Sequence, residues 1–341
     1  MSTAPTASRR IRTFAQFVAA VLYFLLARSI AYRAAALLAD PDWAPLVAVL
    51  ALAFLLLLGY AGMGFWLDSQ LYPVADQGWP RRAGWHREAG KGLAVGWTLA
   101  VVCVLPMALI GGISTSIFFQ LSAWGWLLAD LAFFALVALT EEVAFRGYGF
   151  QRVNDAVGPV RATLVFTVLY AILQGSLSNS NRVSIAVACA FGILLSIAYL
   201  RTRALWLSWG LNFAWKASRA LVFGLAVNGS SSHSPIVQGD PMGPIWLSGG
   251  SFGLDGSWFA FFLLLAAVPV LYRITRDLDF QHNAPVIVPG GLPVDLGGAA
   301  RQAAETAAAT ASQPTFVQIQ QPNPPAADTE PPVPQPPSDT I

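Results

Sequence analysis

Long apolar runs, separated by short charged or glycine- and proline-rich stretches, constrain this 341-residue chain more than any other feature. A helix needs about 20 mostly apolar residues to cross the roughly 30 Å hydrocarbon core of a membrane. The runs in this sequence predict an all-α fold, a polytopic membrane helix bundle with about eight transmembrane helices. The predicted spans are approximately 14–36, 45–67, 91–111, 124–145, 161–177, 183–200, 204–227 and 257–273.

The low number of charged residues excludes an ordinary soluble domain. The chain has 20 Lys+Arg and 18 Asp+Glu, whereas a soluble chain of this length carries about 85 charges, a quarter of its residues. The predicted environment is therefore the lipid bilayer. A net charge of +2 also argues against a nucleic-acid partner, which would require a basic surface.

The distribution of Lys and Arg predicts the orientation, because these residues accumulate in short cytoplasmic loops. With the N-terminus inside, only Arg182, and Arg28 and Arg33 near the far end of the first span, lie toward the outside. The residues predicted to lie inside are Arg9, Arg10, Arg12, Arg81, Arg82, Arg87, Lys91, Arg152, Arg161, Arg201, Arg203, Arg273 and Arg276. We expect a multi-pass protein of the cell (cytoplasmic) membrane with both termini cytoplasmic.

Three regions follow from this pattern. Residues 1–123 are predicted to form three transmembrane helices with a cytoplasmic loop at 68–90, and residues 124–275 a membrane core with an outer loop at 228–256. Residues 276–341 are rich in Pro and Ala and are predicted to be a disordered cytoplasmic tail. The first span resembles a signal peptide, but no small-residue cleavage site follows it, so an uncleaved helix is favoured.

The fourth predicted span contains the richest cluster of charged residues. Glu142 and Arg146 are four residues apart and share a helix face, so they can pair. Glu141 points about 100° away, and Asp130, eleven residues earlier, shares its face to within about 20°. Such a cluster can mark the cytoplasmic end of a helix. We expect the helix instead to continue past Gly147, which would keep Glu141 submerged and make it a candidate functional residue.

The motif Glu141-Glu142-x-x-x-Arg146-Gly147 resembles the first motif of the CAAX prenyl protease and bacteriocin-processing (CPBP) family of membrane endopeptidases. The ordered set of later motifs extends this resemblance over about 124–258. The family has an aromatic-x-x-x-His motif where this chain has Tyr170 to Gln174. It has Leu-Trp and His-x-x-x-Asn motifs where this chain has Leu205-Trp206 and residues 212–216.

The resemblance implies a catalytic glutamate, but this chain lacks the residues that assist it. In the family, the first glutamate is the proposed base for a water, and two histidines and an asparagine position the water and stabilise the oxyanion. Here Glu141 remains, with Glu142 and Arg146 as its support. Gln174 and Asn212 occupy the two histidine positions, and Lys216 replaces the asparagine.

Depth along the helices predicts that these side chains meet. At 1.5 Å per residue, Glu141, Gln174 and Lys216 lie about 18, 20 and 18 Å from the cytoplasmic helix ends, and Asn212 about 12 Å. A shared pocket, reached from the cytoplasmic leaflet, is therefore expected. Gln174 and Asn212 can also be ordinary interhelical hydrogen-bonding residues.

The altered residues favour a degenerate site over a working peptidase. Neither amide can move a proton, and Lys216 would pair with the carboxylates. We expect a protein that binds a membrane protein or peptide without cleaving it. The alternatives are an active glutamate-dependent endopeptidase, which processes C-terminal or leader peptides, and, more remotely, a small-solute transporter with Lys216 and Arg219 in a polar cavity. No cofactor and no metal is predicted, since no His or Cys cluster is present for a zinc. Cys103 and Cys189 lie in apolar runs and predict no disulfide framework.

Overall fold

The computed structural model describes residues 7–178, 180–230, 236–278, 286–287 and 293–294. The chain divides into two units, Met1–Phe280 and Gln281–Ile341. In the second unit, only the short antiparallel strands β3 (Val286–Ile287) and β4 (Pro293–Val294) are described. Most of the predicted tail at 276–341 therefore lies outside the described residues.

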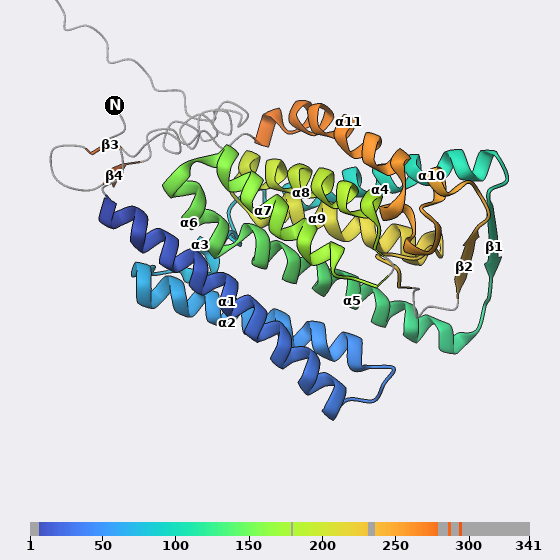
Figure 1. Cartoon of the computed structure of the whole chain (residues 1–341), viewed down its shortest axis with the longest axis horizontal. Helices are drawn as coiled ribbons and strands as arrows, with labels where there is room; N and C mark the ends of the chain where they lie inside the picture. The colour runs from blue at the N-terminus through green and yellow to red at the C-terminus, as the bar shows by residue number, and fades with distance from the viewer. Residues whose placement is uncertain (1–6, 179, 231–235, 279–285, 288–292, 295–341) are drawn as a thin grey trace, which may run out of the picture. The chain divides into compact units, whose positions relative to one another are not determined.

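The first unit is helical and matches the predicted all-α membrane bundle (Figure 1). Its α-helices are α1 (Ala7–Leu38), α2 (Ala44–Asp68), α3 (Pro73–Asp76), α4 (Trp85–Leu109), α5 (Leu121–Arg146), α6 (Tyr148–Val157), α7 (Pro159–Gly175), α8 (Arg182–Thr202), α9 (Leu205–Ala217), α10 (Ile245–Ser248) and α11 (Trp258–Ile274). A π-helical turn, η1 (Ser218–Val222), extends α9. Three 3₁₀ turns are η2 (Gly250–Phe252), η3 (Leu254–Gly256) and η4 (Arg276–Leu278).

Five stretches of the described chain are long and apolar enough to cross a membrane, and the shorter apolar helices α7 and α11 accompany them. The five are Ile11–Leu38, Ala44–Asp68, Trp85–Leu109, Leu121–Val157 and Arg182–Thr202. The predicted span 204–227 is the 13-residue α9 followed by the π turn. The membrane bundle is confirmed, and the count of eight crossings stays a prediction.

The helix that carries the charged cluster does not run straight past Gly147. The backbone at Gly147 has ψ −135°, which ends α5 and begins α6. A Cβ at Gly147 would lie 2.4 Å from the carbonyl oxygen of Val143, so glycine permits this sharp turn. The expected continuous helix is therefore two helices, and Arg146 is the last residue of the first.

Local signals set several helix starts. Pro45 and Pro159 stand in the first turns of α2 and α7, where the missing N–H has no partner to lose. Asn181 accepts a hydrogen bond from the Ser184 N–H, and the Asn181 N–H donates to Ser184 Oγ, which makes a capping box for α8.

Two short strands occur where the sequence predicted only loops. Strand β1 (Ile113–Ile117) pairs in antiparallel fashion with β2 (Val237–Pro241), with Ile113 opposite Pro241. The predicted outer loop thus contains β2, α10, η2 and η3, although residues 231–235 lie outside the described chain. The pairing ties this loop to the connection between α4 and α5.

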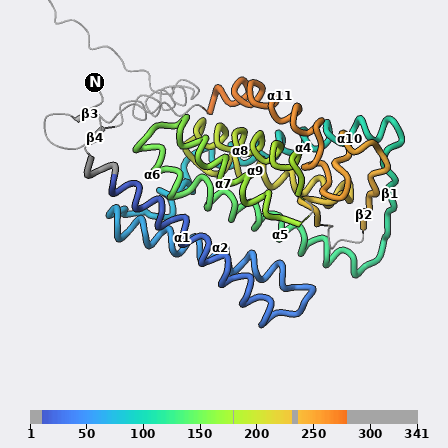
Figure 2. The backbone as a smooth tube through the Cα atoms, in the orientation of Figure 1, coloured from blue at the N-terminus to red at the C-terminus, as the bar shows by residue number. Residues whose placement is uncertain are grey.

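Helix α5 lies between an N-terminal hairpin and the remaining helices of the first unit (Figures 1 and 2). Helices α1 and α2 run side by side in opposite directions, and α2 packs on α5. On its other side α5 packs on α9, which also contacts α4 and α8. Helix α5 is therefore the element that faces both the hairpin and the α9 layer.

A polar cluster at one end joins the hairpin to α6. The Asp68 carboxylate accepts hydrogen bonds from Gln16 (2.9 Å) and from the Tyr148 hydroxyl (2.7 Å). It also forms ion pairs with Arg12 (3.2 Å) and Arg152 (3.4 Å). These contacts fix α1 and α2 against α6.

Helices α4 and α9 approach so closely that glycines are required at their contact. Gly92 and Gly96 of α4 form a small-xxx-small pattern, which allows helix backbones to meet. A Cβ at Gly96 would lie 2.4 Å from the Leu211 carbonyl oxygen, and one at Gly210 would lie 2.5 Å from that of Ala89. This contact sets the position of α9 and of the polar residues it carries.

Candidate functional site

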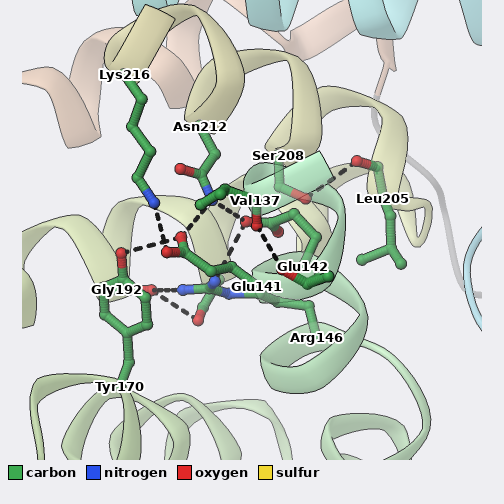
Figure 3. A network of polar contacts seen from close by, with 12 residues as sticks. Val137, Glu141, Glu142, Arg146, Tyr170, Gly192, Leu205, Ser208, Asn212 and Lys216 are labelled. Atoms are coloured by element: carbon green, nitrogen blue, oxygen red, sulfur yellow. Dashed lines mark hydrogen bonds and ion pairs between the residues drawn. The ribbon is translucent and has the colours of Figure 1, made fainter. Parts of the chain in front are cut away.

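The pair Glu142 and Arg146 forms the buried base of the site (Figure 3). Arg146 Nη1 lies 3.3 Å from Glu142 Oε1, and the two side chains are 1% and 0% exposed. Arg146 also donates to the Gly192 carbonyl of α8 (3.2 Å), and its guanidinium lies 5.3 Å from the centre of the Tyr170 ring. One arginine thus joins α5 to α7 and α8.

Glu141 points toward α9 and α7 and is held by three donors (Figure 3). Lys216 Nζ lies 2.5 Å from Oε1, and Asn212 Nδ2 lies 2.9 Å from Oε2. The Tyr170 hydroxyl donates to Oε2 at 3.3 Å. The carboxylate therefore has a hydrogen-bond donor at each oxygen.

Asn212 connects the two glutamates. Its Nδ2 donates to Glu141 Oε2 and also to Glu142 Oε1, at 3.0 Å. Asn212 is 0% exposed and Lys216 is 2% exposed, because α9 packs between α4, α5 and α8. Because Lys216 lies one turn after Asn212, both side chains reach the same part of α5.

Gln174 joins this network only indirectly. Its Nε2 donates to the Tyr170 hydroxyl at 2.9 Å, one helical turn earlier, and that hydroxyl donates to Glu141. The structure thus brings five predicted residues, Glu141, Glu142, Arg146, Asn212 and Lys216, into direct contact. Tyr170 is a site residue that the motif contained but that sequence reasoning did not select.

Glu141, Gln174 and Lys216 line a chamber of about 550 Å³. Its walls are mostly apolar and come from α1, α2, α5 and α7, with Phe24, Val49 and Val137 among them. Asp130 also lines the chamber and is buried. The arrangement is a cavity with apolar walls and a polar floor, typical of ligand-binding sites.

Several residues that line the chamber lie near the ends of their helices. Gln174 is the next-to-last residue of α7, and Lys216 that of α9. Other lining residues are Pro45, in the first turn of α2, and Asn228, after η1. In the predicted orientation these residues lie toward the outer side, whereas we expected access from the cytoplasmic leaflet. Depth counted from the cytoplasmic ends did not show that α7 ends one residue beyond Gln174.

Another buried ion pair lies beyond Lys216, in the π turn that extends α9. Arg219 Nη1 of η1 is 2.8 Å from Asp255 Oδ1 of η3, and the arginine side chain is 0% exposed. Trp215 stacks against this arginine at 4.2 Å and donates from its ring N–H to Asp255 at 3.3 Å. The signals for this pair were an arginine within an apolar run and an aspartate in a glycine-rich loop.

No group of three or more His, Cys, Asp or Glu side chains among the described residues is arranged to hold a metal ion. His86 lies at the start of α4, next to Trp85. His233 and His282 lie outside the described residues.

Comparison with known families agrees with the motifs. Residues 97–218 match the family model described as type II CAAX prenyl endopeptidase Rce1-like. The match runs from α4 to the start of η1, so it contains all six predicted site residues, whereas the predicted resemblance beyond 218 lies outside it. No curated protein and no solved structure matches the chain. The chain is thus an integral membrane protein whose core, over residues 97–218, is similar to the Rce1-like CAAX prenyl endopeptidases of the CPBP family.

Proposed function

We propose that this protein is a degenerate CPBP-type protein, which binds a segment of a membrane protein or peptide in the chamber and does not hydrolyse it. The observation that carries the proposal is the closed network around Glu141. Lys216 and Asn212, which stand where the family has an asparagine and a histidine, both donate to this carboxylate.

A general base must accept a hydrogen bond from the water that it activates. A carboxylate offers about four acceptor positions. Three donors, Lys216, Asn212 and Tyr170, already point at Glu141. A water nucleophile therefore has one position left, and no imidazole of the family pattern stands beside it to pass on its proton.

Oxyanion stabilisation is similarly weakened. Peptide hydrolysis requires donors aimed at the place where the negative oxygen develops. The Asn212 amide nitrogen carries two hydrogens, and both glutamates accept from it. Gln174 directs its amide nitrogen to Tyr170. The two amides in the histidine positions thus stabilise the protein's own groups.

The chamber remains suited to binding. Apolar walls and a few polar groups at the floor are the usual features of a pocket that buries part of a ligand. Its lining from α1, α2, α5 and α7 lies among membrane helices, so the ligand must be one that the bilayer delivers. A short apolar segment of a membrane protein or peptide meets this condition.

Photocrosslinking in proteoliposomes tests binding directly. A photoreactive phenylalanine at Val137, which lines the chamber, should crosslink to members of an added library of apolar peptides. The matched control places the same group at Leu128 of α5, which is 66% exposed. Adducts at 137 and not at 128 support the proposal. Equal labelling at both positions contradicts it, because peptides would then be captured from the lipid.

The alternative is an active endopeptidase in which Glu141 activates water. One observation favours it: the Glu141 side chain is 12% exposed and faces the chamber. If only the assisting residues are missing, the triple variant Gln174→His, Asn212→His, Lys216→Asn should gain peptide hydrolysis. A folded triple variant that remains inert shows that the pocket has diverged further than these three positions.

For the orientation, we infer that both termini are cytoplasmic in a cell membrane. This rests on the position of Lys and Arg between the predicted spans. Single cysteines at Arg12 and at Ser230, in a variant that lacks Cys103 and Cys189, test it with a membrane-impermeant thiol reagent on intact cells. Labelling of position 230 alone is expected, and labelling of position 12 alone contradicts the orientation.

A further inference from the structure

A second cavity of about 290 Å³ adjoins the chamber. It is an apolar groove between α1, α5 and α7, lined by residues such as Val21, Leu25, Phe166 and Leu169. Leu25 is 53% exposed at its edge, so the groove is open toward the surface that faces lipid in a membrane.

Arg28 stands where the groove meets the chamber, since it lines both cavities. It is half-buried, and its guanidinium lies 5.7 Å from the centre of the Tyr32 ring. Within the described part of the chain, Arg28 forms no ion pair with a carboxylate. A cation in a membrane span needs an anionic partner, and this one faces an open cavity.

The groove has a polar end and an apolar end. Arg28 and Ser176, which follows the last residue of α7, mark the polar end, and Ala20 and Phe166 line the other. Arg28 lies eight residues after Ala20, which is about 12 Å along the helix, close to the roughly 15 Å thickness of one leaflet's hydrocarbon. The hydroxyl of Tyr60, another lining residue, is already bonded to the Ala20 carbonyl at 3.2 Å.

From this geometry we propose that the groove binds an anionic phospholipid, with its phosphate on Arg28 and an acyl chain between α1 and α7. A guanidinium is a strong partner for phosphate, and the apolar walls match an alkyl chain. In the predicted orientation the polar end lies toward the outer leaflet, where a headgroup would reside. The inference holds whether or not Glu141 hydrolyses a peptide.

Native mass spectrometry of the purified full-length protein tests the site with dioleoyl phosphatidylglycerol and dioleoyl phosphatidylcholine. The wild type should prefer the anionic lipid by about tenfold. Arg28→Gln should bring this ratio near one, while Arg28→Lys keeps the charge and most of the preference. Arg33→Gln, an exposed arginine of the same helix, is the matched control and should leave the ratio unchanged.

Two further experiments separate the contributions of the acyl chain and the phosphate to binding. Leu169→Trp, which fills the groove, should weaken binding of both lipids. Excess inorganic phosphate should not displace phosphatidylglycerol, because the acyl chain contributes to binding. A preference retained in a folded Arg28→Gln variant, lipid binding unaffected by Leu169→Trp, or displacement by free phosphate would each overturn the proposal.

Discussion

The side-chain amide of Asn212 holds the two adjacent glutamates of α5 together, with its nitrogen 2.9 Å from Glu141 Oε2 and 3.0 Å from Glu142 Oε1. The family has a histidine at this position. Its two ring nitrogens would have to serve both such carboxylates and the substrate. The asparagine donates to both carboxylates at once. The polar floor of the chamber is thereby made from the protein's own hydrogen bonds.

Replacing Asn212 with Ala should therefore destabilise the protein. The change removes a donor from two carboxylates, one of which is fully buried, so the free energy of unfolding should fall by about 2 kcal/mol or more. Thr98→Val is the matched control, since Thr98 donates only to the Ala94 carbonyl of its own exposed helix face. Unfolding in detergent, followed by circular dichroism, measures both. Equal losses in the two variants would show that Asn212 is not a structural bridge.

Lys216→Met should be more damaging than the same change at a surface lysine. It leaves the Glu141 carboxylate without its ammonium in a buried setting, which costs roughly 3–5 kcal/mol. Adding Glu141→Gln should recover most of that loss, because no unpaired charge then remains. Lys91→Met breaks the exposed pair with Asp277 and should cost at most about 1 kcal/mol. If Glu141→Gln gives no recovery, the two charges are not coupled.

Alanine at two glycines of α4 should have opposite effects. At Gly96 the new Cβ would lie 2.4 Å from the Leu211 carbonyl oxygen, which should destabilise the α4–α9 contact by about 1–3 kcal/mol. At Gly90 no atom lies within 4 Å of the new Cβ, so better helix propensity should stabilise by up to about 1 kcal/mol. Thermal unfolding compares them, and destabilisation by Gly90→Ala alone would refute the close contact.

The contribution of the Lys91–Asp277 ion pair to stability should depend on acid pH. Lys91 donates to both oxygens of Asp277, which lowers the pKa of that carboxyl from its ordinary value of 3.8. A lowered pKa in the folded state stabilises the protein above the ordinary value, and this contribution disappears as pH falls through the folded pKa. The small stability difference between wild type and Asp277→Asn should be constant from about pH 5 to 8 and should shrink as the pH falls below the ordinary value and through the lowered pKa. A difference that grows on acidification would have the wrong sign.

The sequence predicted the membrane bundle and the cluster of charged residues well, because apolar length and helical periodicity are local properties. Glu142 and Arg146 follow from a four-residue spacing, and their pairing needed no tertiary information. The break at Gly147 was missed because a glycine near a helix end is compatible with either course. The break depends on how closely the backbone at Gly147 packs against the Val143 carbonyl.

Other features depended on contacts between distant segments. The Arg219–Asp255 pair and the pairing of β1 with β2 join residues that no spacing relates. The end of α7 only one residue beyond Gln174 was not predicted, because the apolar run continues to Leu177. Tyr170 stood in the quoted motif, yet its role became visible only when its hydroxyl was found between Gln174 and Glu141.

Peptide hydrolysis in proteoliposomes, compared between the wild type and Glu141→Gln, decides whether the protein cleaves peptides or only binds them. Glutamine keeps the shape and one carbonyl acceptor but cannot act as a base. With a library of membrane-inserted peptides, we expect wild type, Glu141→Gln and protein-free liposomes to release the same background of fragments. Fragments released by the wild type and absent with a folded Glu141→Gln variant would contradict it and establish an active endopeptidase.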